Sequence, residues 1–378
     1  MVYATRLIWA APRGRRRISL RRTRCGGRNV ALMFLHHRDV ATREARRISR
    51  ERNGGTAADF QNNRRRPCAI IALVRSGGTC EAARMRTEET TGGFSLVTVT
   101  SGARSLRSIE HGETFHPVVG PMAEARGLHV EQSRLAERAG ECARPFVIWD
   151  VGLGAGANAI AVIEALSEAR CPARVELRSF DCTLEPLEFA LHHADELAYL
   201  PRWREPVARL IGSGRAVAGN VDWHFHRGDF REFVRESRDG VCAPRTAEVP
   251  GPDAILYDPY SPEANPGMWT LEHFTRLRAC LDETRPCTLT SYSRSTAVRV
   301  TLKLAGFFVG YGGGIGEKNQ TTMAATHREL LAQPLGAEWL GRVGRSTRGA
   351  PLRERPAPGP ISQDDLAALH AKFPGSGD

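Results

Sequence analysis

The sequence lacks several features that would narrow its function at once. Only three of its 53 basic residues are Lys, and none of its nine cysteines forms a C-x-x-C pair or has a histidine at zinc-site spacing. We therefore expect reduced thiols and no metal. The longest apolar stretch of the N-terminal segment, CAIIALV at 68–74, is far too short to span a membrane. These absences predict a cytoplasmic protein with no membrane partner.

Positive charge is concentrated in the first 84 residues. The chain carries a formal charge of +11, but residues 1–84 carry +15 and the remainder −4. A basic chain suggests a nucleic-acid partner. For this Arg-rich extension three interpretations stay open: a disordered arm that binds nucleic acid, a transit peptide, or translation from a start called too early, with Met85 as the true start. The Arg, Gly and Pro content, typical of a GC-rich genome, favours the last.

From about Phe94 onward, strands alternate with helices. This alternation predicts a parallel sheet with helices on both faces and a ligand site at the carboxyl ends of the strands. Residues 307–313 and 319–326 are expected to form a closing hairpin. The predicted strands are 144–151, 175–180, 222–230, 253–260 and 287–292, and the predicted helices are 157–169, 184–197, 266–281 and 296–306.

Three glycines alternate in WDVGLGAGANAI (149–160), directly after Asp150. A turn from strand to helix needs at most one glycine. Gly152, Gly154 and Gly156 therefore indicate that something lies close against the backbone.

An acid stands at or just beyond the end of each of the first four strands: Asp150, Asp181, Asp229 and Asp258. The four carboxylates would converge on one crevice, which suits a cationic or hydroxyl-rich ligand better than a scaffold. The second acid can bind ribose hydroxyls, and the third can accept a hydrogen bond from an adenine amino group. We expect a class I S-adenosylmethionine-dependent methyltransferase fold with a mostly parallel seven-stranded sheet. The first three acids and the glycines would bind S-adenosyl-L-methionine.

A dinucleotide-binding fold also fits the glycines. Gly152, Gly154 and Ala157 satisfy its relaxed pattern, with Asp181 as the ribose acid. Asp150 favours the methyltransferase, because it would repel a pyrophosphate but suits a sulfonium that carries an ammonium group. Two other classes stay open: an NAD-binding oxidoreductase, and a methyltransferase or aminopropyl transferase that acts on a small-molecule or protein amine.

Residues 258–262, DPYSP, resemble the Asp/Asn-Pro-Pro-aromatic box of amino-group methyltransferases. In that box, a side-chain oxygen and a backbone carbonyl hold the attacking amine in line with the methyl group. We expect Asp258 to be catalytic, and Pro259 and Tyr260 to contact the substrate. HGETFH (111–116) can fold over the same crevice as a lid. Glu113 and His116 are its candidate substrate contacts, although a structural turn explains them equally well.

These stretches resemble the methyltransferase module of the bifunctional tRNA 5-methylaminomethyl-2-thiouridine biosynthesis protein. The resemblance covers about residues 94–345, and its most specific part runs from Asp258 to Trp269. It implies methylation of the amine of 5-aminomethyl-(2-thio)uridine at the tRNA wobble position. Two-domain members add a flavin-dependent oxidase; because this chain ends soon after residue 345, we expect no FAD. Pro259 departs from the family's usual Gly.

We expect four regions. They are the extension 1–84, an N-terminal strand and lid at 85–143, the methyltransferase domain 144–349, and a Pro-rich flexible tail at 350–378.

His224 and His226 share one face of a predicted strand and have no acidic or Cys partner in register. We interpret them as packed strand histidines rather than metal ligands.

Overall fold

The chain forms two compact units, Met1–Thr87 and Glu88–Asp378. In the first unit, three antiparallel strands lie in the order β1-β2-β3. Met85, the predicted start, lies outside the described residues. The computed structural model describes strands β1 (Ala4–Ala10), β2 (Arg15–Cys25) and β3 (Arg28–His36), and residues 93–236, 249–314, 320–355 and 359–373.

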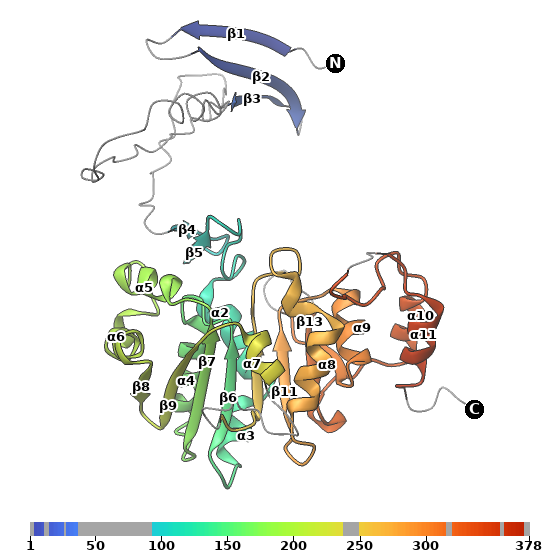
Figure 1. The fold of residues 1–378 in the computed structure, drawn as a ribbon. Helices are drawn as coiled ribbons and strands as arrows, with labels where there is room; N and C mark the ends of the chain where they lie inside the picture. The colour runs from blue at the N-terminus through green and yellow to red at the C-terminus, as the bar shows by residue number, and fades with distance from the viewer. Residues whose placement is uncertain are drawn as a thin grey trace, which may run out of the picture. The chain divides into compact units, whose positions relative to one another are not determined.

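The second unit is built on an eight-stranded sheet, in the order β12-β13-β11-β10-β6-β7-β9-β8 (Figure 1). Its five central strands are parallel, and β8, β12 and β13 pair antiparallel. This confirms the class I methyltransferase fold and the closing hairpin, with one strand more than the seven predicted. The strands are β6 (Phe146–Val151), β7 (Val175–Asp181), β8 (Arg215–Ala218), β9 (Val221–Arg227), β10 (Ala254–Tyr257), β11 (Thr288–Ser291), β12 (Phe308–Gly312) and β13 (Thr321–Ala325).

The extra strand β8 comes from residues 197–220, where the sequence shows no recognisable motif. This stretch forms the short helix η2 (Pro201–Trp203), helix α6 (Arg204–Ser213) and β8, which pairs with β9 and forms the edge of the sheet.

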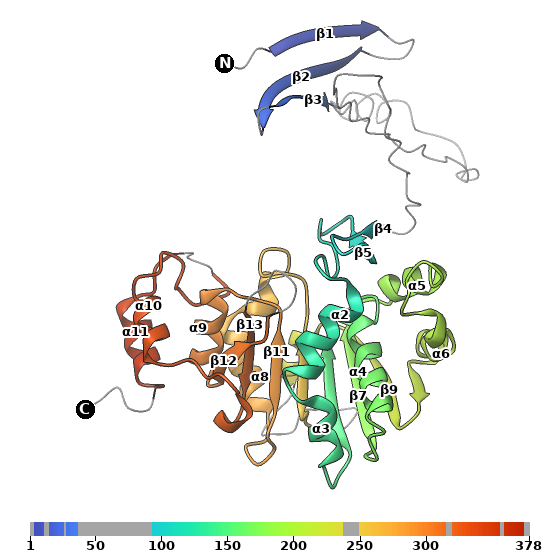
Figure 2. The same cartoon turned by 180° about the vertical axis from the view of Figure 1, so that it is seen from behind.

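Helices cover both faces of the sheet, because alternate residues of the central strands point to opposite sides. In β6, Phe146 and Ile148 join one hydrophobic cluster, while Val147, Trp149 and Val151 join the other. The first cluster contains residues of helices α3 (Leu135–Gly140), α4 (Ala157–Glu168), α5 (Glu185–His192) and α6. The second contains residues of helices α7 (Phe230–Glu236), α8 (Leu271–Cys280), α9 (Thr296–Leu304) and α10 (Ala337–Val343). Figures 1 and 2 show the two layers from opposite sides.

Two predicted helices are shorter than expected. The helix predicted at 184–197 ends at His192, and the one predicted at 266–281 is interrupted at Thr270. The hydroxyl of Thr270 accepts the His273 N–H at 3.2 Å and caps α8, leaving η3 (Pro266–Trp269) as a separate turn. Among the described helices, none has the length and apolar character that crossing a membrane requires.

The strand order reverses between β6 and β10, which brings their following loops together. Tyr257 pairs with Val151, and the Asp258 N–H donates to the Val151 carbonyl at 2.9 Å. Ligands of doubly wound sheets bind outside the carboxyl ends of strands at such a reversal. The glycine turn after β6 and the 258–262 loop after β10 therefore flank one site.

A segment before β6 reaches this site. It contains the hairpin β4 (Phe94–Thr98) and β5 (Arg104–Ser108), where one strand was predicted, and the lid residues 111–116. Helix α2 (Pro121–Ala125), the π-helix η1 (Arg126–Glu131) and α3 follow and lead back to the sheet.

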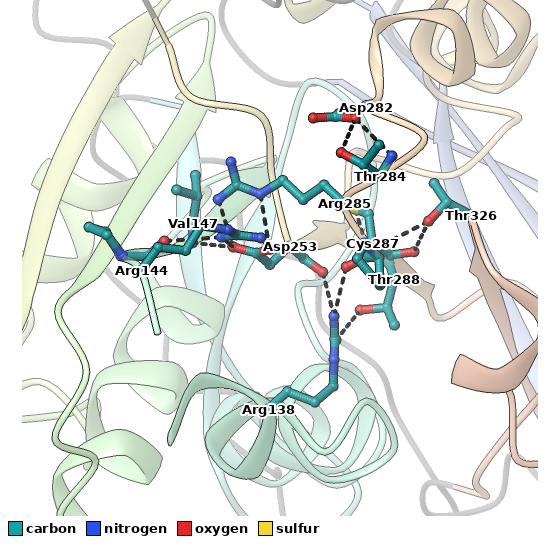
Figure 3. A network of polar contacts seen from close by, with 12 residues as sticks. Arg138, Arg144, Val147, Asp253, Asp282, Thr284, Arg285, Cys287, Thr288 and Thr326 are labelled. Carbon is teal, nitrogen blue, oxygen red and sulfur yellow. Dashed lines mark hydrogen bonds and ion pairs between the residues drawn. The ribbon is translucent and has the colours of Figure 1, made fainter. Parts of the chain in front are cut away.

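At the amino ends of the central strands, opposite the site, arginines surround the buried Asp253 (Figure 3). Its carboxylate accepts hydrogen bonds from Arg144 at 2.6 and 2.9 Å and from Arg285 at 2.9 and 3.0 Å. It also accepts the Val147 N–H at 2.8 Å, and its backbone carbonyl accepts from Arg138 at 2.7 Å. The network joins the starts of β6, β10 and β11 to helix α3.

The C-terminal residues differ from the flexible tail expected at 350–378. Helix α11 (Gln363–His370) is capped by Ser362, and Leu369 is fully buried in the second hydrophobic cluster. The Leu352 N–H donates to the Thr301 hydroxyl at 2.8 Å, which ties the segment to α9. Pro-rich composition alone does not reveal this packing, because it depends on surfaces of distant helices.

Candidate functional site

The three glycines of the turn adopt left-handed backbone conformations, with φ of +91° at Gly152, +51° at Gly154 and +79° at Gly156. A Cβ at Gly152 would lie 2.6 Å from the Asp258 carbonyl oxygen, and one at Gly156 would lie 2.9 Å from Leu187. A Cβ at Gly154 would lie 3.3 Å from the Phe115 ring. The chain itself therefore requires glycine at Gly152 and Gly156, while Gly154 faces the lid.

The N–H groups of the glycines are all engaged within the protein. Gly152 donates to the Phe180 carbonyl at 3.0 Å, Gly156 donates to the Leu153 carbonyl at 2.8 Å, and Gly154 donates to Asp181 at 3.1 Å. A dinucleotide fold uses such N–H groups to bind a pyrophosphate. The turn presents no glycine N–H for that purpose, which argues against the dinucleotide alternative.

Asp150 is buried beneath the turn. Its Oδ2 accepts the Ser179 hydroxyl at 2.7 Å, and Trp223 Nε1 donates to that hydroxyl at 2.9 Å. Its Oδ1 is buried and meets no hydrogen-bond donor among the described residues. Burial, and then the negative charges of Asp258 and Asp181, raise the pKa of Asp150 to about 7.

Asp181 and Asp229 have different surroundings. Asp181 is half-buried; burial raises its pKa, although N–H groups including that of Gly154 act in the opposite direction. Asp229 accepts hydrogen bonds from Arg231, which lower its pKa. The structure thus brings Asp150, Asp181 and Asp258 together and pairs Asp229 with an arginine.

Asp258, half-buried after β10, is held by a residue that the sequence analysis did not assign. Asn158, in the first turn of α4, donates from Nδ2 to Asp258 Oδ2 at 2.8 Å. Its own Oδ1 is buried and meets no donor among the described residues. The signal available in the sequence was a lone amide side chain just after the glycine turn, at a helix position that the sheet buries.

The lid lies on the 258–262 loop. Glu113 accepts the Ser261 N–H at 3.1 Å and also the Ser261 hydroxyl. His111 stacks on Tyr260, with ring centroids 4.0 Å apart and an interplanar angle of 7°. Phe115 meets Tyr260 edge-on at 5.7 Å. The lid therefore covers one face of Tyr260 with His111, a residue that the sequence analysis did not assign.

The other predicted substrate contacts lie nearby. Pro259 is buried and Tyr260 is half-buried; burial raises the pKa of Tyr260 to about 12. The Tyr260 carbonyl accepts from Trp269 Nε1 at 2.9 Å, which fixes the loop. His116 is half-buried and has an unusual φ of +47°. Burial, followed by the charge of His116, lowers the pKa of His129 to about 3.

Tyr292, just after β11, is a further residue of the site. Burial, followed by the charges of Asp258 and Glu113, raises its pKa. Its ring meets Trp269 edge-on at 6.1 Å. Sequence patterning gave no sign of this proximity, because β11 is separated from β10 along the chain by the whole of α8.

The predicted strand histidines have protein partners. His224 pairs with Asp222 at 2.9 Å, so the expectation that no acidic partner lies in register was wrong. His226 stacks on Phe180 with ring centroids 4.9 Å apart. Within the described residues, no cluster of His, Cys, Asp and Glu has the composition of a metal site.

Comparisons with known proteins agree with this geometry. Residues 216–327 match a family model described as S-adenosyl-L-methionine-dependent methyltransferase. The match includes β9, β10 and the Asp258 loop, and the glycine turn lies outside it.

Two curated relatives are tRNA 5-methylaminomethyl-2-thiouridine biosynthesis bifunctional proteins MnmC. The one from Aeromonas hydrophila is 31% identical over 258 residues, covering 63% of this chain and 36% of the relative. The one from Methylibium petroleiphilum is 28% identical over 235 residues, covering 60% and 34%. This chain therefore spans about a third of the length of these relatives.

A solved structure, MNMC2 from Aquifex aeolicus, superimposes with a TM-score of 0.55 at 25% identity, covering 75% of this chain and 85% of that one. Its agreement extends beyond the segment matched by the family model and includes most of the described second unit. The family match over residues 216–327, these relatives and the solved structure agree that the chain is similar, in sequence and in fold, to S-adenosyl-L-methionine-dependent methyltransferases.

Proposed function

We propose that this protein uses S-adenosyl-L-methionine to methylate the amine of 5-aminomethyl-(2-thio)uridine at the wobble position of tRNA. The observation that carries the proposal is the placement of Asp258 against the glycine turn, held there by Asn158. The relatives whose names specify this tRNA modification support the substrate class.

The residues of the site fit the cofactor. Asp150 Oδ1 and Asn158 Oδ1 are buried acceptors without donors among the described residues, and an unsatisfied buried acceptor is costly. A ligand with ammonium and ribose hydroxyl groups would supply those donors. Asp150, Asp181 and the glycine turn would hold it, whereas Asp229, paired with Arg231, would contribute only an oxygen that can accept a further hydrogen bond.

The cofactor, when bound, supplies a methyl group on a positively charged sulfonium. An alkyl amine has an ordinary pKa near 10, so at neutral pH it is mostly an unreactive ammonium. Asp258 accepts a hydrogen bond from the amine after its proton has left, and orients the nitrogen lone pair toward the methyl group. Asn158 holds the Asp258 carboxylate in position, and Glu113 holds the loop through Ser261.

Tyr260 and the lid would enclose the uracil. His111 covers one face of the Tyr260 ring, so the base would meet the remaining part of that ring or the outer face of the exposed His111. His111 and Tyr260 would therefore share the aromatic contact with the substrate.

The direct experiment is methyl transfer to tRNA that carries 5-aminomethyl-2-thiouridine, followed by nucleoside mass spectrometry. We expect the modified nucleoside to gain one CH₂ unit, only when S-adenosyl-L-methionine is present. A small alkyl amine and an amine-bearing peptide are tested alongside. Methylation of either of these without methylation of the tRNA would contradict the proposal.

A further inference from the structure

Two arginines contact Tyr311, and the charge of a third acts on one of them. Arg299 of α9 is buried, and its guanidinium carbon lies 4.7 Å from the centre of the Tyr311 ring. Arg342 of α10 is about half-exposed and donates to the Tyr311 hydroxyl at 2.9 Å. Arg294, just before the start of α9, is exposed, and its charge acts on Arg299. We call Arg294, Arg299 and Arg342 the arginine cluster.

The cluster has too little negative charge to be a structural ion-pair network. Among the described residues, the one carboxylate within ion-pair distance of the cluster is Glu338, which lies 3.5 Å from Arg342 and has an 88% exposed side chain. Arg299 donates instead to the neutral Thr322 hydroxyl and the Thr321 carbonyl, both at 3.0 Å. Burial, followed by repulsion from Arg342 and Arg294, opposes the charge of Arg299 and lowers its pKa, with Tyr311 acting the other way.

The network around Asp253 provides the contrast. There, two arginine side chains bond to one buried carboxylate, which neutralises one of their two positive charges. A buried cation without an acid partner is costly. The arginine cluster therefore favours an anionic group that is supplied from outside the described chain.

The cluster is continuous with the reaction site. Tyr292, which feels the charge of Asp258, lies two residues before Arg294. The Ser293 carbonyl between them accepts the Thr322 hydroxyl at 2.6 Å, and Thr322 in turn accepts from Arg299. Figures 1 and 2 both show α9 and α10 adjacent at this end of the sheet.

We propose that the arginine cluster binds the phosphodiester backbone of the nucleic-acid strand that carries the nucleoside to be methylated. The planar guanidinium forks of Arg294 and Arg342 suit phosphate oxygens, and Tyr311 with Arg299 forms the floor beneath them. This inference rests on the proposed function, since it assumes an RNA substrate. It also explains how a body with a net charge of −4 can bind a polyanion locally.

The test is the affinity for tRNA as a function of salt concentration, measured on the full chain. Four proteins are compared: the wild type, Arg294→Ala/Arg342→Ala, Arg294→Lys/Arg342→Lys, and the control Arg209→Ala/Arg235→Ala. The control removes two exposed arginines of α6 and α7 that pair with Glu205 and Glu232. Calorimetry with S-adenosylhomocysteine shows that each variant retains a folded cofactor site.

We expect the cluster Ala pair to bind tRNA at least about 10-fold more weakly, with a log–log salt slope shallower by about 1–2. The Lys pair keeps the charges and should retain most of the slope, and the control pair should match the wild type. A cluster Ala pair with the same slope as the control pair would overturn the inference. Wild-type tRNA binding through the cluster without methylation would instead contradict only the proposed function.

Discussion

The neighbouring strands β6 and β10 have one buried carboxylate at their amino ends, Asp253, and one at their carboxyl ends, Asp150. The two carboxylates differ in their hydrogen-bond partners. At the amino end, Asp253 accepts four hydrogen bonds from Arg144 and Arg285. Burial alone would raise the pKa of Asp253, but these arginines lower it below its ordinary value. At the carboxyl end, Asp150 has one hydroxyl donor, and its other oxygen meets no donor in the described part of the chain; burial raises its pKa to about 7.

Burial is therefore not what separates a structural acid from a functional one, since both carboxylates are buried. The difference lies in whether the chain supplies the donors. At the amino end the arginines complete the bonding of Asp253, and the result is a joint between strands. At the carboxyl end the described residues leave acceptors of Asp150 and Asn158 without donors, which lowers the stability of the ligand-free protein. Under the proposed function the cofactor supplies those donors.

The largest expected effect is on stability, at the amino end. Asp253→Ala leaves Arg285 and the Val147 N–H without their acceptor, and breaking a buried ion pair typically costs about 3–5 kcal/mol. Chemical unfolding monitored by Trp fluorescence measures the loss. The control is Glu205→Ala, which breaks an exposed pair with Arg209 and should cost about 0.5 kcal/mol. Equal losses in the two variants would remove the structural role assigned to Asp253.

Next in size is the loss of cofactor affinity at the glycine turn. Gly154→Val fills the space beside Phe115 and should weaken cofactor binding by at least about 30-fold, or about 2 kcal/mol. Gly102→Val is the matched control, because Gly102 also has a positive φ but no atom within 4 Å of its Cβ position. Calorimetric titration with S-adenosylhomocysteine measures both. An unchanged affinity in Gly154→Val would remove the glycine turn from the cofactor site.

The sequence predicts the local patterns of the site but not the contacts between distant segments. The acid after each strand, the alternating glycines and the 258–262 loop are local patterns, and the strand order then brings them together. Asn158 and Asp258 are 100 residues apart and meet only because α4 starts beside the end of β10. The stacking of His111 on Tyr260 and the burial of Leu369 likewise depend on packing between distant segments.

A pH dependence of stability is also expected at the carboxyl end. Because folding raises the pKa of Asp150 from 3.8 to about 7, its contribution to stability is present below about pH 4 and is lost as the pH rises to about 7. Asp150→Asn does not titrate, so its stability relative to wild type should rise over that interval. Unfolding at several pH values in the absence of ligand measures the difference between the two proteins.

The same titration should affect the cofactor in the opposite direction. An ionised Asp150 attracts a cationic ligand, so wild-type affinity for S-adenosyl-L-methionine should rise about 10-fold between pH 5 and 8. In Asp150→Asn the affinity should change much less. Parallel pH profiles for the two proteins would show that Asp150 does not contact the cofactor.

The role of Asp258 in orienting the amine is tested most directly by the single-turnover rate of methylation of aminomethyl-uridine tRNA by Asp258→Ala, from pH 6 to about 10. We expect the rate to fall at least about 100-fold, while cofactor affinity changes less than about threefold, because Asp258 orients the amine and does not hold the cofactor. Asp258→Asn retains an oxygen acceptor and should lose less. The wild-type rate should rise with pH until the bound amine has lost its proton, and then level off. An Asp258→Ala rate within about fivefold of wild type at every pH would show that Asp258 is only a turn residue.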